Sequence, residues 1–475
     1  MYYGLLTDLY QLTMGYGYWK TGKAEQTAVF NLFFRKLPFK NGYAVAAGLS
    51  TAVDFIQNFK YTTEDIQYLS QLKGNDGEPL FEPDYLDYLA NLSFTGDIDA
   101  VEEGEIVFPH QPMIRVTAPL IQAQLIETGL LCIINFQTLI ATKASRLISI
   151  CQGDEILEFG LRRAQGIDGA LAASRAAYIG GCHATSNVLA GKMYGIPVKG
   201  THAHAWVMAF DTELEAFEQY AKVLPNNCVF LVDTYDTIEG VKNAIKVGHI
   251  LKQKGYTLAG IRLDSGDLAF LSKQARQMLD EAGFTDTKIV ASNDLDEYVI
   301  ADLKKQGAVI TVWGVGTNLV TAKDQPALGG VYKLGALWED NQWKYKIKIS
   351  EIAIKISNPG IQQVRRFYDE NNIAICDMLI DQNLPYSAFV VNQENESQVL
   401  ETSQYSRYRD LLIKIIKNGK LVYDIPNATQ ARDNTQKRLS EFSSGIQGIT
   451  PISDYFVGLE QNLYQLKKQH VKVKS

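Results

Sequence analysis

Two histidines separated by one residue are the first groups in this chain that could carry chemistry. His202 and His204, two of the six histidines, follow Gly200 and Thr201 at the predicted end of a strand. In an extended segment, side chains two positions apart leave the backbone on the same face. The stretch therefore holds either a reactive imidazole at the mouth of a barrel or a pair of ordinary polar loop histidines.

An arginine inside an apolar run is the second such group. Arg262 stands between Ile261 and Leu263 in a segment expected to be a buried strand. A lone buried guanidinium is costly unless an anion pairs with it. Its partner is either a structural carboxylate, Asp233 or Asp264, or the planar carboxylate of a ligand, which a guanidinium can bind through two parallel hydrogen bonds.

Two consecutive turns have the composition of a phosphate cradle. Ser292 and Asn293 follow one predicted strand, and Gly314, Gly316 and Thr317 follow the next. Glycines allow the backbone to approach a ligand closely, and N–H groups at the start of a helix favour negative charge. Each turn alone is common as a plain tight turn. Their occurrence after two successive strands favours an anion site.

Aspartates at neighbouring strand ends have a more ordinary interpretation. Asp267 and Asp294 each stand just before a segment with helical periodicity, where an aspartate usually accepts a hydrogen bond from the first helical turn. Asp294 and Glu297 also have the spacing of a capping box. We therefore predict that both aspartates cap helices.

A parallel sheet is needed to bring these groups together. From about residue 155 the chain repeats an apolar strand, a polar strand end and a helix, with strands expected at 156–160, 196–200, 228–232, 258–263, 288–291 and 309–312. Such apolar runs are strands covered on both faces. The cadence favours an α/β barrel over a doubly wound sheet, and the chain has no Gly-x-Gly-x-x-Gly fingerprint. Because chemistry collects at the carboxyl ends of barrel strands, the groups above are predicted to share one rim.

The regions before and after this repeat do not show the same alternation of strands and helices. We expect an N-terminal α/β lobe at residues 1–130, the barrel with the active site at 131–335, and C-terminal segments at 336–475. Within the last part, alternation of apolar and lysine residues over 343–349 predicts a half-exposed strand, and 405–418 and 427–442 are expected to be helical.

Composition limits the possible functions. The chain has 475 residues, 46% of them hydrophobic and 21% charged, which is typical of a soluble globular protein with two or three domains. A net charge of -7 argues against a general nucleic-acid surface. No apolar run is long enough for a membrane span, and the first residues lack the features of a signal peptide. Five scattered cysteines without a CxxC pair argue against a disulfide framework or structural zinc, so we expect a cytoplasmic protein.

Ten stretches distributed over the chain carry a family resemblance. They are TDLYQLTM (7–14), FRKLPF (34–39), EFGLRRAQG (158–166), TSN (185–187), GTHAH (200–204), DTYD (233–236), RLDSGDL (262–268), GVGTN (314–318), LGGVYKL (328–334) and YFVGL (455–459). Together they resemble nicotinate phosphoribosyltransferases, the ATP-coupled enzymes of NAD salvage. The resemblance implies an N-terminal α/β lobe joined to an incomplete α/β barrel, with C-terminal segments that complete the lobe, pack around both and add a helical cap.

The resemblance also implies roles for individual residues. It makes His204 the phosphohistidine, Thr317 a contact of the phosphoribosyl pyrophosphate, and Tyr10, Thr201 and Arg262 the nicotinate contacts. In relatives of this fold the N-terminal aromatic residue reaches the site of a neighbouring subunit, which implies a homodimer.

The implied reaction transfers phosphoribosyl from 5-phosphoribosyl 1-pyrophosphate to nicotinate. The products are nicotinate mononucleotide and pyrophosphate, and ATP is converted to ADP and phosphate. We expect the 5'-phosphate to be held by Ser292, Asn293, Gly314, Gly316 and Thr317. Asp264 is the best candidate to hold ribose hydroxyls or hydrated Mg²⁺, with Mg²⁺ itself carried on the substrate phosphates.

Two alternatives remain open at this stage. A nicotinamide phosphoribosyltransferase on the same fold should offer a carboxylate to the amide, and that role falls where this chain has Ala203 and His204. A metal-dependent amidohydrolase is the distant alternative, because His-x-His on a barrel strand is a metal-ligand pattern. One departure from the family concerns Ala205, which stands where Ser or Glu often follows the reactive histidine. It leaves open what orients His204.

Overall fold

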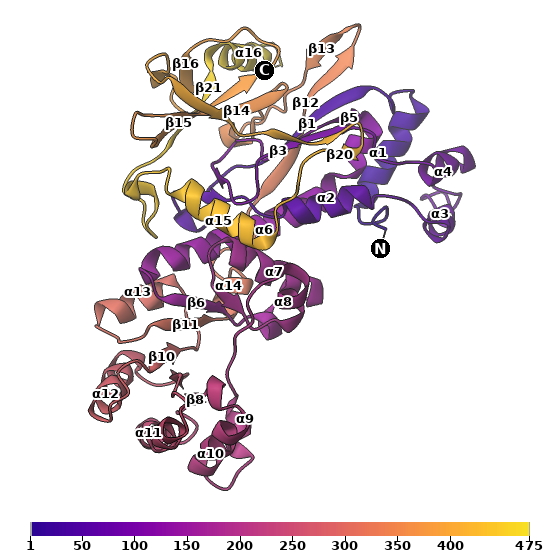
Figure 1. Ribbon diagram of the computed structural model, residues 1–475. Helices are drawn as coiled ribbons and strands as arrows, with labels where there is room; N and C mark the ends of the chain where they lie inside the picture. The colour runs from indigo at the N-terminus through magenta and orange to yellow at the C-terminus, as the bar shows by residue number, and fades with distance from the viewer. Residues whose placement is uncertain (1, 475) are drawn as a thin grey trace. The chain divides into compact units, whose positions relative to one another are not determined.

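The computed structural model describes residues 2–474, and the chain divides into two compact units (Figure 1). The first unit comprises Met1–Leu139 and Ala327–Ser475, and the second comprises Ile140–Pro326. Within the described residues, none of the helices is both long enough and apolar enough to cross a membrane.

The first unit is built on a seven-stranded antiparallel sheet in the order β13-β12-β1-β5-β3-β19-β20. Its strands are β1 (Thr27–Phe34), β3 (Asp97–Ala100), β5 (Ile114–Pro119), β12 (Gly330–Glu339), β13 (Gln342–Tyr345), β19 (Ile413–Lys417) and β20 (Lys420–Leu421). Its helices from the first part of the chain are α1 (Leu9–Lys20), α2 (Leu49–Gln57), α3 (Thr63–Ser70), α4 (Pro83–Ala90) and α5 (Leu120–Leu125). The central strand β1 is buried over nearly its whole length, as expected of its apolar sequence.

A second sheet of the same unit is formed by the C-terminal part of the chain, in the order β17-β16-β21-β15-β14-β18. Its strands are β14 (Gln362–Tyr368), β15 (Ala374–Asp381), β16 (Phe389–Asn392), β17 (Val399–Glu401), β18 (Arg407–Asp410) and β21 (Phe456–Glu460). Two short strands, β2 (Ala44–Val45) and β4 (Ile106–Val107), pair separately, and the C-terminal helices are α15 (Ala428–Leu439) and α16 (Gln461–Lys474).

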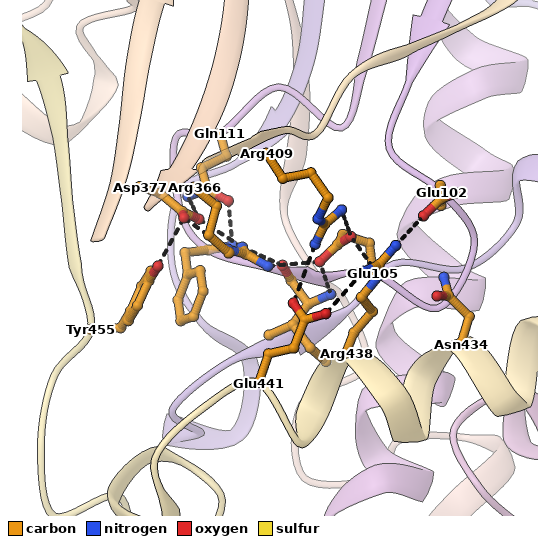
Figure 2. Close-up of polar contacts among 12 residues, drawn as sticks. Glu102, Glu105, Gln111, Arg366, Asp377, Arg409, Asn434, Arg438, Glu441 and Tyr455 are labelled. Atoms are coloured by element: carbon orange, nitrogen blue, oxygen red, sulfur yellow. Dashed lines mark hydrogen bonds and ion pairs between the residues drawn. The ribbon is translucent and has the colours of Figure 1, made fainter. Parts of the chain in front are cut away.

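A buried ionic network lies in this first unit (Figure 2). The guanidinium of Arg366, on β14, is fully buried and lies 2.7 Å from Glu105 and 2.7 Å from Asp377. Glu105 also binds Arg409 at 2.7 Å. Because Glu105 precedes β4 while its partners come from β14 and β18, the network joins the N-terminal and C-terminal parts of the chain.

The second unit is a six-stranded parallel sheet in the order β7-β6-β11-β10-β9-β8. Its strands are β6 (Glu155–Glu158), β7 (Ala184–Thr185), β8 (Val229–Leu231), β9 (Gly260–Leu263), β10 (Lys288–Ala291) and β11 (Val312–Val315). Its helices are the second half of α6 (Glu127–Cys151), α7 (Ile167–Ile179), α8 (Val188–Tyr194), α9 (His204–Met208), α10 (Glu213–Val223), α11 (Thr237–Gln253), α12 (Leu268–Glu281), α13 (Glu297–Lys305) and α14 (Thr317–Val320). The predicted α/β class is confirmed, and the barrel stays a prediction.

Two predicted elements are displaced. The segment 196–200 contributes only an isolated bridge, between Val198 and Thr185. The last strand of the parallel sheet, expected at 309–312, is β11 at Val312–Val315, which places Gly314 inside the strand. The apolar run alone did not locate the strand, because Val309 and Ile310 belong to the loop that precedes it.

The predicted helix at 405–418 is wrong. This segment forms β18, paired antiparallel with β14, and β19, paired antiparallel with β3. Its isoleucines are β-branched and favour strands. The two sheets of the first unit offer edges for these strands, and tertiary pairing decided the structure against the charged, helix-like pattern.

One of the two predicted helix caps is correct. Asp267 caps α12 and accepts a hydrogen bond from the Phe270 N–H at 3.0 Å. The cap of α13 is Asp296, which accepts from the N–H groups of Tyr298 and Val299, so the predicted capping box at Asp294 is wrong. The predicted partner residue in that box, Glu297, is buried and forms ion pairs with Lys143 and Arg146.

Candidate active site

The side chains predicted at the strand ends of the second unit surround one cavity of about 390 Å³. The predicted residues that line it are Thr201, His204, Arg262, Asp264, Ser292, Asn293, Gly314, Gly316 and Thr317. The carboxyl ends of neighbouring parallel strands meet at one edge of the sheet, which explains why groups so distant in sequence converge. Tyr10 belongs to α1 of the first unit, where its side chain is exposed.

Arg262 organises the floor of this cavity. Its Nε donates to Ser292 Oγ at 2.7 Å, its Nη1 to Thr201 Oγ1 at 2.9 Å, and its Nη2 to Asp264 Oδ1 at 2.9 Å. The ring of Phe159 lies 5.9 Å from the guanidinium carbon. These contacts use three of the five N–H donors of an arginine, so the predicted structural pair with Asp264 exists and donors remain for an anionic ligand.

Asp264 is held as a carboxylate. Its Oδ1 accepts hydrogen bonds from Arg262 and from the Ser292 hydroxyl. Burial works to raise the pKa of Asp264, but the Ser292 hydrogen bond and the charge of Arg262 outweigh it and lower the pKa below the usual value. The group is therefore ionised at neutral pH and suited to hold hydroxyl groups or a hydrated cation.

His204 has a carboxylate partner that the sequence interpretation did not assign to it. His204 is the first residue of α9, and its Nε2 lies 3.3 Å from Oδ1 of Asp233, which lies two residues beyond the end of β8. The Asp233 side chain is 1% exposed, and its Oδ2 accepts from the Asp264 N–H at 2.7 Å and from the Ser265 hydroxyl at 2.8 Å. Asp233 is thus fixed by the two residues that follow β9 and orients the imidazole, a task that Ala205 cannot perform.

His202 also lines the cavity, but it is buried and has other partners than His204, contrary to the prediction for an extended segment. The chain turns at Ala203 into α9, and His202 is buried. Its Nε2 accepts a hydrogen bond from the Leu231 N–H at 3.2 Å, and its ring centroid lies 5.1 Å from that of Tyr220. Burial lowers the pKa of His202, which fits a neutral core histidine. In the part of the chain that the structure describes, no three His, Cys, Asp or Glu side chains are placed to hold a metal.

The two turns differ in how they meet the cavity. A Cβ on Gly314 would lie 2.6 Å from the ring of Phe159, so this position excludes a larger residue for packing reasons. The helix α14 that starts at Thr317 has only 4 residues, so its dipole contributes little to anion binding. The groups that can donate to an anion on this side are the backbone N–H groups and the Thr317 hydroxyl. On the other side, Asn293 has φ 117°, a value that residues other than glycine seldom adopt.

The sequence interpretation assigned no role to two arginines that line the cavity. Arg162 and Arg163 lie in the short 3-10 turn after β6, and neither side chain is buried. Two adjacent arginines just after a strand end were the available signal. Together with Arg262 they give the cavity an excess of positive charge suited to a polyanionic substrate.

Comparison with known proteins gives matches over most of the chain. Models of the N-terminal domain, of the main family region and of the C-terminal domain of nicotinate phosphoribosyltransferase match residues 5–135, 155–362 and 361–467. The chain is 47% identical to nicotinate phosphoribosyltransferase of Bacillus subtilis over 99% of this chain and 96% of that protein. It is 33% identical to the human enzyme over 97% of this chain and 95% of that one.

A solved structure shares the whole architecture. The crystal structure of human nicotinic acid phosphoribosyltransferase matches with a TM-score of 0.84 and 30% identity, over 98% of this chain and 99% of that one. Family models that together span most of the chain and relatives of nearly equal length leave no room for the amidohydrolase alternative. The chain belongs to the nicotinate phosphoribosyltransferase family.

Proposed function

We propose that this protein transfers phosphoribosyl from 5-phosphoribosyl 1-pyrophosphate to nicotinate, with ATP as co-substrate. The observation that carries the proposal is the cavity of the second unit, where the His204–Asp233 pair, the Arg262 guanidinium and the two turns lie together. The ring nitrogen of nicotinate attacks C1 of the sugar, and pyrophosphate leaves with the bonding electrons. The protein must align the two reactants and neutralise the leaving group.

Recognition of nicotinate rests on Arg262 and Thr201. The guanidinium retains donors for a carboxylate, and the Thr201 hydroxyl is held 2.9 Å from it. The segment 200–204, where an amide-specific site would need a carboxylate, contains none. These features support the acid over the nicotinamide alternative.

The anion side of the cavity is assigned to the sugar phosphate. Ser292, Asn293, Gly314, Gly316 and Thr317 would hold the 5'-phosphate, and Asp264 would hold the ribose hydroxyls. Mg²⁺ would travel with the substrate phosphates and supply positive charge against the developing pyrophosphate. The carboxylate of Asp264 fits a hydrated ion of this kind, because a single carboxylate can bind through the ion's water.

ATP is assigned to His204. If Asp233 accepts the hydrogen of Nε2, the lone pair of Nδ1 is available to attack the γ-phosphorus, and ADP leaves. Arg162 and Arg163 are placed to balance the charge of the transferred phosphoryl group. Hydrolysis of the phosphohistidine during the cycle supplies free energy that tightens substrate binding and drives product formation.

An omission assay tests the reaction itself. Purified protein with nicotinate, phosphoribosyl pyrophosphate, Mg²⁺ and ATP should form nicotinate mononucleotide, and leaving out nicotinate or the pyrophosphate should abolish the product. Nicotinamide should react with a kcat/KM lower by about 10–100-fold, because it forms no charge-assisted bonds with Arg262. Equal turnover of the acid and the amide would refute the assignment of nicotinate.

Replacing Arg262 by lysine should reduce kcat/KM for nicotinate by about 10–100-fold. A lysine keeps the charge but cannot contact Thr201, Ser292 and a carboxylate together. Steady-state kinetics with nicotinate varied would measure the effect. Arg276→Lys is the matched control, since Arg276 bonds Thr287 and Phe284 carbonyls outside the cavity. Similar losses in both variants would show that the effect is not specific to Arg262.

A homodimer is proposed as the working assembly. Each unit exposes apolar side chains, Leu9, Tyr10 and Met14 of α1 in the first unit and Val188, Leu189 and Met193 of α8 in the second. Contacts between such faces of two copies would bury this area, and Tyr10 of one copy would stack on the pyridine ring bound by the other.

Subunit mixing checks this assembly. Tyr10→Ala and Arg262→Ala homodimers should each have low activity, and mixtures should regain activity because one site of a mixed dimer is intact. Sedimentation velocity should show a dimer. A monomeric wild-type protein with full activity would contradict the proposal.

The cytoplasm is the compartment we propose. Burial raises the pKa of the Cys151 thiol to about 12 and that of the Cys228 thiol to about 11. Both groups are therefore protonated and poorly reactive at neutral pH, as expected of structural cysteines in a reducing environment.

A further inference from the structure

We propose that Asn318 is a positioning residue that ties the two turns of the anion pocket together. Asn318 is the second residue of α14, directly after Thr317, and it is 6% exposed. Its Nδ2 donates to the backbone carbonyl of Asp294 at 3.1 Å and to that of Leu295 at 3.1 Å. Both partners are acceptors only, so the amino group of the amide must face them. The side chain is a cross-link from the second turn to the first.

The first turn needs such a restraint. Its residue Asn293 has φ 117°, a sparsely populated region in which a non-glycine residue is strained. Strained conformations persist where the surroundings over-determine them. The two carbonyls bound by Asn318 belong to the two residues that directly follow Asn293, and the Leu295 N–H closes the turn onto the Asn293 carbonyl at 2.7 Å. Asn318 thus fixes the backbone just after the strained residue.

The pocket depends on the spacing of these turns. Asn293 and Asp294 line the cavity from one turn, and Gly316 and Thr317 line it from the other. An anion held by donors from both turns is bound well only if their separation is fixed, and a displacement of about 1 Å in a site can cost about 100-fold in rate. Asn318 contacts the backbone of one turn and belongs to the other, and it is not among the residues that line the cavity.

The side chain of Asn318 forms hydrogen bonds on one side only. Its Oδ1 is buried and has no hydrogen-bond partner among the described residues. An apolar side chain would avoid this unpaired acceptor but would leave the Asp294 and Leu295 carbonyls without the Nδ2 donor. The amide is therefore held by its contacts with the first turn.

The test uses two substitutions of Asn318 and one control. Asn318→Asp is nearly isosteric but presents a carboxylate to two carbonyls, and Asn318→Leu removes both donors without adding charge. The control is Thr287→Val. The buried Thr287 hydroxyl donates to the Leu258 carbonyl at 3.0 Å. Thr287 directly precedes β10, so it lies at the opposite end of that strand from the turn at Asn293.

The expected result is a split between the two substrates. Because this readout rests on the proposed function, the wild-type protein must first form product from nicotinate. Both Asn318 variants should then raise the KM for phosphoribosyl pyrophosphate by about 10–100-fold and that for nicotinate by less than about threefold. Calorimetric binding of phosphoribosyl pyrophosphate should weaken in parallel. Thr287→Val should leave both KM values unchanged.

Other outcomes have separate meanings. A wild-type protein without nicotinate-dependent product would refute the proposed function but not the proposed role of Asn318. Calorimetry with phosphoribosyl pyrophosphate would still test that role. An unchanged affinity for phosphoribosyl pyrophosphate in Asn318→Leu would overturn the proposed positioning role of Asn318. Equal losses for both substrates, together with a lowered melting temperature, would show a structural role and would also overturn it.

Discussion

Replacing His204 by alanine is expected to abolish the stimulation of product formation by ATP while leaving a slow, ATP-independent transfer. The imidazole is the nucleophile proposed for the phosphoryl group, and Arg262, Asp264 and the anion turns do not depend on it. Without His204 the cavity can still align nicotinate with phosphoribosyl pyrophosphate, but no phosphohistidine forms. Initial rates with and without ATP measure the effect. The acid-labile label from γ-labelled ATP should disappear from the protein in parallel.

A milder change separates the nucleophile from its support. Asp233→Asn keeps the size of the side chain, but its amide can offer either a donor or an acceptor to the imidazole, so the tautomer that exposes Nδ1 is no longer enforced. We expect ATP stimulation to fall in this variant without vanishing. His249→Gln is the control, because His249, on α11, packs against Phe284 and does not line the cavity. Full ATP stimulation in His204→Ala would remove the phosphohistidine from the mechanism.

Most side chains that line the cavity could be predicted from the sequence because their positions follow a simple rule. Parallel strands present their carboxyl ends at one edge, so polar residues after successive apolar runs must meet there. Arg262, Asp264, Ser292 and Thr317 were all placed by this rule, and the structure brings them together. Their substrate roles stay predictions until kinetics test them.

The pairing of His204 with Asp233 could not be predicted in the same way. It depends on the chain turning at Ala203, so that His202 enters the core and His204 starts a helix. A strand at 196–200 that continued in extended form through His204 would have put both imidazoles on one face. The segment 196–200 forms only a single bridge, and the chain does not stay extended. Local chain direction in a short connection depends on what packs beneath it, here Phe217, Tyr220 and Phe230, and a residue pattern does not contain that information.

The pairing of strands from distant parts of the chain was the other feature that the sequence did not predict. The first unit is assembled from both ends of the chain, since Val29 of β1 pairs with Ala336 of β12 and Ile98 of β3 pairs with Ile416 of β19. The pattern of 405–418 fits a charged helix taken alone, and only the available sheet edges make it two strands. The buried charges of the first unit follow from the same assembly, because Glu105 and Arg366 meet only when the C-terminal strands are in place.

Replacing Arg366 by methionine is expected to destabilise the protein by about 3–5 kcal/mol. The guanidinium is fully buried between Glu105 and Asp377 (Figure 2). It also donates to the Ile106 carbonyl at 2.8 Å. Removing one partner of a buried ionic network leaves carboxylates without compensation, a far larger cost than the loss of an exposed pair. Urea denaturation at neutral pH would measure the difference in the free energy of unfolding.

The adjacent residue on β14 supplies the matched control. Arg365 pairs with Asp410, and both side chains are partly exposed, at 18% and 38%. Such a pair contributes about 0–1 kcal/mol, so Arg365→Met should change the free energy of unfolding by about that amount. Equal destabilisation by the two substitutions would show that burial of the charge at Arg366 is not what matters.

Acidification provides an independent check on the network. Burial acts to raise the pKa of Glu105, but the charges of Arg366, Arg409 and Arg438 outweigh it and lower the pKa in the folded protein. A lowered carboxylate pKa contributes stability that is complete above the unfolded value, about 4.3, and is lost as the pH falls through the folded value. Arg366→Met removes part of this contribution at neutral pH, so the difference between variant and wild type should shrink below about pH 4. A difference that stays constant from pH 7 to pH 3.5 would mean that Glu105 is not stabilised through Arg366.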